Sequence, residues 1–266
     1  ERNLKDEAIR YANYRSGTGG GQFNTLVIST RNIYDQFNYG EPSPVAIGRF
    51  VDYMISMGVR SKHNVFLIGH GVTLPSHMVK EFPYEVPSFG NPGSDGLLIA
   101  NLTNSPFSNP NIPAIPIGRL TAFEADHVKN YLEKVMYYEA ESHSGTADQL
   151  SWRKNVLHIL GAKRSYELAS EPANGLGFRA IFNRAASQMV NEGAYNWNIS
   201  LESNDAYATS AVVDAIPAPA PIEDNIASGV GSIIYFGHGH HELTHYNFAT
   251  VPDNPNKRFP FFYITG

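Results

Sequence analysis

The residues with the clearest chemical potential are histidines gathered in one short segment. Residues 237–245 read Gly-His-Gly-His-His-Glu-Leu-Thr-His and directly follow an apolar run at residues 232–236. Histidine exchanges protons near neutral pH, and the glycines on either side of His238 give its backbone freedom and its ring exposure. His238 is therefore a candidate general base, or an ion-pair partner for a nucleophile. The structural alternative is a loop histidine that covers the end of a sheet.

The same segment contains a His-Glu-x-x-His pattern, formed by His241, Glu242 and His245. In zinc peptidases this pattern lies on a helix, where both histidines share one face and the glutamate acts as general base. Room for such a helix is poor, because glycines precede the pattern and Pro252 and Pro255 follow it closely. No His or Glu follows His245, so a downstream third ligand of the usual type is missing. A zinc peptidase built on His241 and His245 is the alternative enzyme.

The composition excludes several other kinds of chemistry and partner. The 266 residues contain no cysteine, which removes disulfides, thiolate metal sites and any thiol nucleophile within them. A net charge of -5 without clusters of Lys and Arg predicts no nucleic-acid partner. No apolar run reaches the roughly 18 residues of a membrane span and no signal peptide opens the sequence, so this domain is not expected to insert into a membrane.

Short apolar runs without alternation predict buried strands of a parallel sheet. Helices are expected where apolar residues recur at helical spacing, one of them opened by Ser43 and Pro44 and another beginning at Thr121. The prolines of residues 216–222 predict an extended surface connector. Strands that alternate with helices indicate an α/β fold with a doubly wound, mostly parallel sheet and helices on both faces. The predicted strands cover residues 24–30, 64–69, 115–118, 155–160, 195–201, 232–236 and 259–264, and the other predicted helices cover residues 4–12 and 178–189.

Ligands of parallel sheets bind beyond the carboxyl ends of the strands, and two histidines are predicted to lie there. One is His238, and the other is His70, which follows the strand predicted at residues 64–69. His70 is therefore expected to line the substrate cleft, and the structural alternative is a hydrogen-bonded loop histidine. The proline-rich residues 74–113 are expected to add substrate-binding surface. A single domain over residues 1–266 is the simplest organisation, with 1–150 and 151–266 as candidate subdomains.

Several separated segments resemble the gingipain family of cysteine peptidases, in the caspase-like clan, and its sortase-type relatives from the type IX secretion system. Each segment is weak alone, but together they follow the order expected of the family over nearly the whole chain. His70 is a departure, because relatives more often carry an acidic residue there. The segments are residues 33–40 (Ile-Tyr-Asp-Gln-Phe-Asn-Tyr-Gly) with 44–47, Ser94-Asp95, Ile117-Gly-Arg119, Tyr137-Tyr-Glu139 and Trp152-Arg153.

The resemblance implies where the catalytic pair of such a peptidase would lie. The family's histidine is the middle residue of a Gly-His-Gly at a strand end, which corresponds to His238. The family's cysteine lies seven residues beyond a proline that corresponds to Pro260, which is position 267, immediately after Gly266. We therefore expect the chain to stop before its nucleophile. The alternative is an inactive homologue with another residue at that position.

The resemblance also implies supporting roles for other residues. The backbone amide of Gly239 is expected to serve as an oxyanion donor. Asp95 matches a loop carboxylate of the family and is expected to orient the imidazole or face the substrate, with a solvated loop aspartate as the alternative. Glu242 follows the histidine loop closely and is placed with His70 among the substrate-binding residues.

Taken together, the resemblance implies a cysteine endopeptidase or a sortase-like transpeptidase that acts on secreted polypeptides. It would be secreted, or located at the bacterial cell surface or outer envelope, as part of a larger surface or secretion-system protein. No cofactor is required, and structural calcium is compatible with the family. The 266 residues alone are expected to be inactive. A non-catalytic scaffold module of a surface protein is the alternative outside the enzymes.

Overall fold

The computed structural model divides the chain into two compact units, Glu1–Met136 and Tyr137–Gly266. Each unit has strands and a hydrophobic core of its own. Helix α5, Ala125–Ser144, begins in the first unit and ends in the second. The residues that the structure describes are 4–57, 63–72, 85–90, 93–107, 109–161, 196–203, 218–219, 223–237, 239–240, 243–244, 246–247, 254 and 256–265.

Serine caps begin two helices of the first unit. The Ser29 hydroxyl accepts a hydrogen bond from the backbone N–H of Asn32, and the Ser43 hydroxyl accepts one from Val45, each at 3.2 Å. Each cap satisfies an N–H group that has no partner within the helix. The helices of this unit are α1 (Lys5–Ser16), η2 (Thr18–Gly20), α2 (Thr30–Phe37), α3 (Pro44–Ser56), η3 (Gly96–Leu98) and the first part of α5.

The described strands of the first unit form two parallel pairs. Strand β1, Val65–Ile68, pairs with β4, Ile117–Leu120, so that Leu67 lies beside Arg119. Strand β2, His70–Val72, pairs with β3, Glu85–Pro87. Because β2 follows β1 after only Gly69, the chain around His70 lies at the carboxyl end of the β1–β4 pair.

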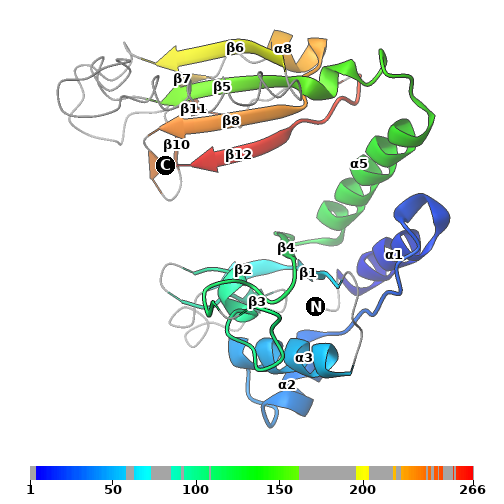
Figure 1. Cartoon of the computed structure of the whole chain (residues 1–266), viewed down its shortest axis with the longest axis vertical. Coiled ribbons are helices and arrows are strands. Elements are labelled where there is room, and N and C mark those ends of the chain that lie inside the picture. The colour runs from blue at the N-terminus through cyan, green and yellow to red at the C-terminus, as the bar shows by residue number, and fades with distance from the viewer. Residues whose placement is uncertain are drawn as a thin grey trace, which may run out of the picture. The chain divides into compact units, whose positions relative to one another are not determined.

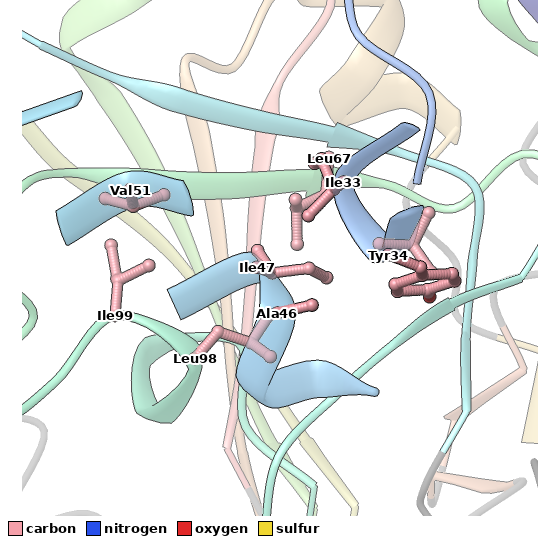
Figure 2. Packing of buried hydrophobic residues seen from close by; sticks show 9 residues of the cluster. Ile33, Tyr34, Ala46, Ile47, Val51, Leu67, Leu98 and Ile99 are labelled. Carbon is pink, nitrogen blue, oxygen red and sulfur yellow. The ribbon is translucent and has the colours of Figure 1, made fainter. Parts of the chain in front are cut away.

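Apolar residues of α2 and α3 form the core of the first unit together with β1 and the segment after η3 (Figure 2). Ala46 and Ile99 are completely buried. The apolar positions of α3 follow helical spacing, so one face of that helix is removed from water. The buried cluster comprises Ile33, Tyr34, Ala46, Ile47, Val51, Leu67, Val86, Leu98 and Ile99.

The second unit contains a four-stranded parallel sheet in the order β12-β8-β5-β6 (Figure 1). Parallel neighbours that are not consecutive in sequence require crossover connections between the strands. Its strands are β5 (Asn155–Gly161), β6 (Asn196–Ser203), β8 (Ser232–Gly237) and β12 (Phe261–Thr265). The other described elements are η4 (Ser151–Lys154), α8 (Glu223–Ser228) and the short strands β7 (Ala218–Pro219), β9 (Gly239–His240), β10 (Leu243–Thr244) and β11 (Tyr246–Asn247).

The central strands of this sheet carry the core of the second unit. Leu157 and Ile159 of β5 and Ile233 and Tyr235 of β8 are fully buried. The alternate positions along each strand share one face, which packs against Ile226 and Val230 around helix α8. Burial of this face fixes which side chains of β5 and β8 point inward.

The predicted strand at residues 24–30 is wrong. Those residues contain no strand, and α2 begins at Thr30 with Ser29 as its cap. Leu26 and Val27 are 62% and 43% exposed. An apolar run forms a strand only where a neighbouring strand supplies backbone partners, and no described strand pairs with this segment.

Most other predicted elements are confirmed, some with shifted ends. Strands β1, β5, β6, β8 and β12 occur where apolar runs predict them, and α1 and α3 match the predicted helices. The helix expected from Thr121 begins at Ala125, and the strand expected at residues 115–118 is Ile117–Leu120. Within residues 216–222, Ala218–Pro219 form β7, which pairs with β11. The helix predicted at residues 178–189 lies outside the described residues.

The parallel strands and helices confirm an α/β fold, but the expected single doubly wound sheet is not seen in the described residues. Their strands form one four-stranded sheet and four two-stranded sheets. Six of the seven predicted strands are confirmed and several short strands were not predicted. The grouping of strands into sheets depends on long-range pairing, which local sequence does not specify. Within the described part of the chain, no helix has the length and apolarity that a bilayer crossing requires.

Candidate active site

The strand ends that could carry chemistry belong to β8 and β12 in the second unit. These strands are parallel neighbours in an uninterrupted register, from Phe261 beside Ser232 to Thr265 beside Phe236. The carboxyl end of β8 is Gly237, and it also pairs with Gly161 at the end of β5. His238 follows β8 directly, and its own position lies outside the described residues. The carboxyl ends of β5, β8 and β12 therefore lie at one edge of the sheet.

The segment after His238 contains an antiparallel pair of short strands. Leu243 pairs with His240, and Thr244 pairs with Gly239, so β9 and β10 form a hairpin. The zinc-peptidase pattern requires a helix from His241 to His245, yet its two described residues, Leu243 and Thr244, are extended. The described backbone therefore weighs against a zinc motif here, while His241, Glu242 and His245 lie outside the described residues.

Asp95 lies in the first unit, where Arg119 holds it. Nε of Arg119 donates to Oδ2 of Asp95 at 2.8 Å, and Nη2 donates to Oδ1 at 2.6 Å. The Ser88 hydroxyl donates to the same Oδ1 at 3.0 Å. Burial alone would raise the pKa of Asp95, but hydrogen bonds and charge from Arg119, with the Ser88 hydroxyl, outweigh it and lower the pKa. The carboxyl is therefore an anion at neutral pH, and its charge is compensated.

A pocket of about 340 Å³ surrounds this ion pair. Arg119 also donates through Nη1 to the backbone oxygen of Gly69, which joins the loop after β1 to the ion pair. The pocket thus lies at the carboxyl end of the β1–β4 pair, where parallel sheets commonly bind ligands. It is lined by His70, Gly71, Val72, Ser88, Gly93, Asp95, Arg119 and Thr121.

His70 lines this pocket from the start of β2. Its ring lies against Phe123, with ring centroids 4.6 Å apart. Nδ1 of His70 is buried and has no hydrogen-bond partner among the described residues. Within the described residues, this ring nitrogen therefore lacks the hydrogen bond that the loop-histidine alternative expects. His70 and Asp95 thus line the same pocket of the first unit.

The candidate residues that the structure describes belong to different units of the chain. His70 and Asp95 are brought together in the first unit. Gly239 lies in the second unit as part of β9. Sequence reasoning missed the contribution of Arg119 and Ser88 to the pocket. The signal for Arg119 was present in Ile117-Gly-Arg119, because an arginine at the edge of a buried strand needs a partner.

The described residues also bear on metal binding. In that part of the chain, no group of three or more His, Asp or Glu side chains could hold a metal ion. His158, in the middle of β5, is 2% exposed, and burial lowers its pKa to about 4. Its ring is therefore neutral at neutral pH and belongs to the core of the sheet.

Comparison with known proteins gives one match. The family model described as Peptidase family C25 matches residues 1–266, which is the whole sequence. No curated protein and no solved structure matches the chain.

Proposed function

The chain belongs to peptidase family C25, the gingipain family of cysteine peptidases, and we propose that it forms a peptidase domain in which His238 is the catalytic imidazole. Polypeptides are the substrate class that this family implies. We further propose that the nucleophile is a cysteine at position 267, directly after Gly266. We also propose residues 1–266 as a single caspase-like α/β domain.

The register between β8 and β12 is the observation that supports this proposal. Every residue of β12 pairs with the residue of β8 that precedes it by 29 positions, as Thr265 does with Phe236. Continued past the strand ends, this register brings position 267 level with His238. Paired residues of neighbouring parallel strands are about 4.8 Å apart and direct their side chains to the same face. An imidazole and a thiol at these positions would be close enough to share a proton.

Such a pair performs acyl transfer in two steps. The imidazole of His238 accepts the thiol proton, the thiolate attacks the peptide carbonyl carbon, and the carbonyl electrons move to oxygen. The backbone N–H of Gly239 supports the resulting oxyanion. When the oxyanion collapses, the C–N bond breaks, and the imidazolium gives its proton to the leaving amine. Water then resolves the thioester by hydrolysis, whereas an amine resolves it by transpeptidation, as in a sortase.

His70, Asp95 and Glu242 enter the proposal as substrate-facing residues. Arg119 compensates the charge of Asp95, so that carboxylate offers hydrogen-bond acceptance to a substrate without net negative charge. Asp95 alone is therefore not expected to give the peptidase a preference for basic side chains in its substrate. The substrates we propose are secreted polypeptides, at a bacterial cell surface or in its surroundings, within a larger surface or secretion-system protein. Structural calcium is compatible with this role, and no other cofactor is needed.

The test uses the parent chain with the residues that follow Gly266. A peptide carrying a thiol-directed electrophile should label this protein, and His238→Ala should abolish the labelling. The matched control is His245→Ala, which removes a histidine of the same segment and should label normally. Labelling that survives His238→Ala and is lost in His245→Ala would contradict the assignment. So would stoichiometric zinc whose removal by a chelator ends peptide cleavage.

The 266 residues by themselves provide a second test. They contain no cysteine, so they should neither cleave peptides nor react with the electrophile. Thiol-dependent turnover by this segment alone is incompatible with a nucleophile at position 267.

A further inference from the structure

Gly231 joins three strands at the amino end of the four-stranded sheet. Its backbone N–H donates to the carbonyl of Asn155, the first residue of β5, at 2.9 Å. Its carbonyl accepts a hydrogen bond from the N–H of Phe261, the first residue of β12, also at 2.9 Å. Gly231 itself directly precedes β8. One residue therefore sets where β8 begins relative to both neighbours.

There is no room for a side chain at Gly231. A Cβ atom there would overlap the carbonyl oxygen of Arg153 and would lie 2.7 Å from the Arg153 Cα. Backbone atoms cannot rotate away as the end of a flexible side chain can. Any larger residue at position 231 must therefore displace the chain at Arg153 or move the start of β8.

The Arg153 side chain makes the first of these movements costly. Its Nη2 donates to the Tyr138 carbonyl and to Glu141 Oε2, each at 2.8 Å, and its guanidinium lies 3.8 Å from the centre of the Tyr138 ring. Both partners belong to α5, so Arg153 is anchored to the end of that helix. A side chain at Gly231 would therefore push β8 more readily than it would push the segment before β5.

The two ladders that begin at Gly231 run to the opposite edge without a bulge. Strands β5 and β8 keep one register from Val156 beside Ser232 to Gly161 beside Gly237. Strands β8 and β12 keep theirs up to Thr265. By contrast, β5 and β6 shift register between Val156 and Leu157. A displacement at the amino end of β8 is therefore transmitted to its carboxyl end.

We infer that Gly231 is a positioning residue for the reaction, acting through the register of β8. This inference rests on the function proposed above, since it concerns the relative positions of His238 and residue 267. Gly231 lies seven residues before His238, which is about 23 Å along an extended strand. A misplacement of about 1 Å between reacting groups can lower a rate by about 100-fold. Gly231 thus controls catalysis without touching the substrate.

The test compares Gly231→Ala with Gly20→Ala in the parent chain. Gly20 is a matched control, because a Cβ there would overlap the Tyr14 carbonyl oxygen and lie 2.7 Å from the Arg15 Cα, yet it belongs to the first unit. Active sites are titrated with the peptidyl electrophile, so that misfolded molecules are not counted. Cleavage of a peptide gives kcat and KM per titrated site, and the pH dependence of alkylation by iodoacetamide reports the coupling of thiol and imidazole.

Gly231→Ala should lower kcat per site at least about 10-fold, with KM changed less than about 2-fold, and should move the alkylation profile to higher pH. Gly20→Ala should match the wild type in kcat, in KM and in the pH profile of alkylation. If Gly231→Ala does not fold, the double variant Gly231→Ala/Arg153→Lys is measured instead, because lysine loses the paired hydrogen bonds of arginine and lets the segment before β5 give way. It should show the same changes in smaller degree. A Gly231→Ala variant, alone or with Arg153→Lys, that matches Gly20→Ala per site overturns the inference. A wild-type parent chain that the electrophile does not label overturns the proposed function instead.

Discussion

Arg119 holds the carboxylate of Asp95 through two hydrogen bonds, from Nε at 2.8 Å and from Nη2 at 2.6 Å. The arginine side chain is 10% exposed and the aspartate side chain 24%. These residues come from two of the segments that resemble the gingipain family, Ser94-Asp95 and Ile117-Gly-Arg119. The structure gives a physical reason for their joint occurrence, since each residue supplies the charge that the other needs. The ion pair also holds the Gly69 and Ser88 loops around one pocket.

Asp95→Asn should lower the free energy of unfolding by about 2 kcal/mol, because the poorly exposed Arg119 loses its counter-charge. The control is Asp35→Asn, which breaks an exposed ion pair with Arg31 and should cost no more than about 0.5 kcal/mol. Urea unfolding at neutral pH measures both. Equal losses of unfolding free energy in the two variants would show that the buried ion pair stabilises the fold no more than the exposed one.

The same pair predicts how stability depends on acid. Folding lowers the pKa of Asp95 below its ordinary value of 3.8, so the carboxylate stabilises the fold above that pH. The contribution is lost as pH falls through the lower pKa of the folded state. The stability difference between wild type and Asp95→Asn should therefore be largest near neutral pH and shrink below about pH 4. A difference that grows on acidification would refute the assigned direction.

His158 predicts a second dependence on pH. Burial lowers its pKa from 6.5 to about 4, so between these values the unfolded chain binds a proton that the folded chain does not. Stability should rise with pH across this window, and the contribution should be lost as pH falls from about 6.5 toward 4, by up to about 3 kcal/mol. Unfolding curves of wild type and His158→Leu, measured across the window, check this. Parallel pH profiles for the two proteins would contradict it.

Arg153 should be a large contributor to the stability of the second unit. It binds Tyr138 and Glu141 and stacks on an aromatic ring, so Arg153→Ala should cost about 2 kcal/mol. Arg10→Ala is the comparison, because Arg10 pairs with Glu7 on an exposed helix surface and should cost less than about 1 kcal/mol. Thermal unfolding of both variants measures the two losses of stability. A larger loss for Arg10→Ala than for Arg153→Ala would disprove the prediction.

The cap of α3 can be tested by Ser43→Ala. The serine hydroxyl accepts the Val45 N–H, and its removal should lower stability by about 1 kcal/mol. Ser56→Ala alters the other end of the same helix, where the hydroxyl donates to the Tyr53 carbonyl, and should change stability by less than about 0.5 kcal/mol. Chemical denaturation distinguishes these outcomes. If Ser43→Ala leaves stability unchanged, water satisfies the Val45 N–H in place of the serine hydroxyl.

Local patterns predicted the elements well where the information is contained in neighbouring residues. The Ser43-Pro44 start of α3 and the apolar runs of β5 and β8 were found from spacing alone. The apolar run at residues 24–30 was misjudged, because a strand also needs a partner that local sequence does not specify. Helix α2 was missed, although Ser29 caps it and Ile33 and Tyr34 face the core.

The sequence by itself determined the types of most elements, the absence of cysteine within the 266 residues and the order of the family-like segments. It also placed His238 directly after a strand. Only the tertiary structure decided that β12 lies beside β8 in one uninterrupted register, and that Arg119 forms an ion pair with Asp95. The reason is physical: helix and strand preferences arise from neighbouring residues, whereas register and ion pairs depend on hydrogen bonds between segments far apart in the chain.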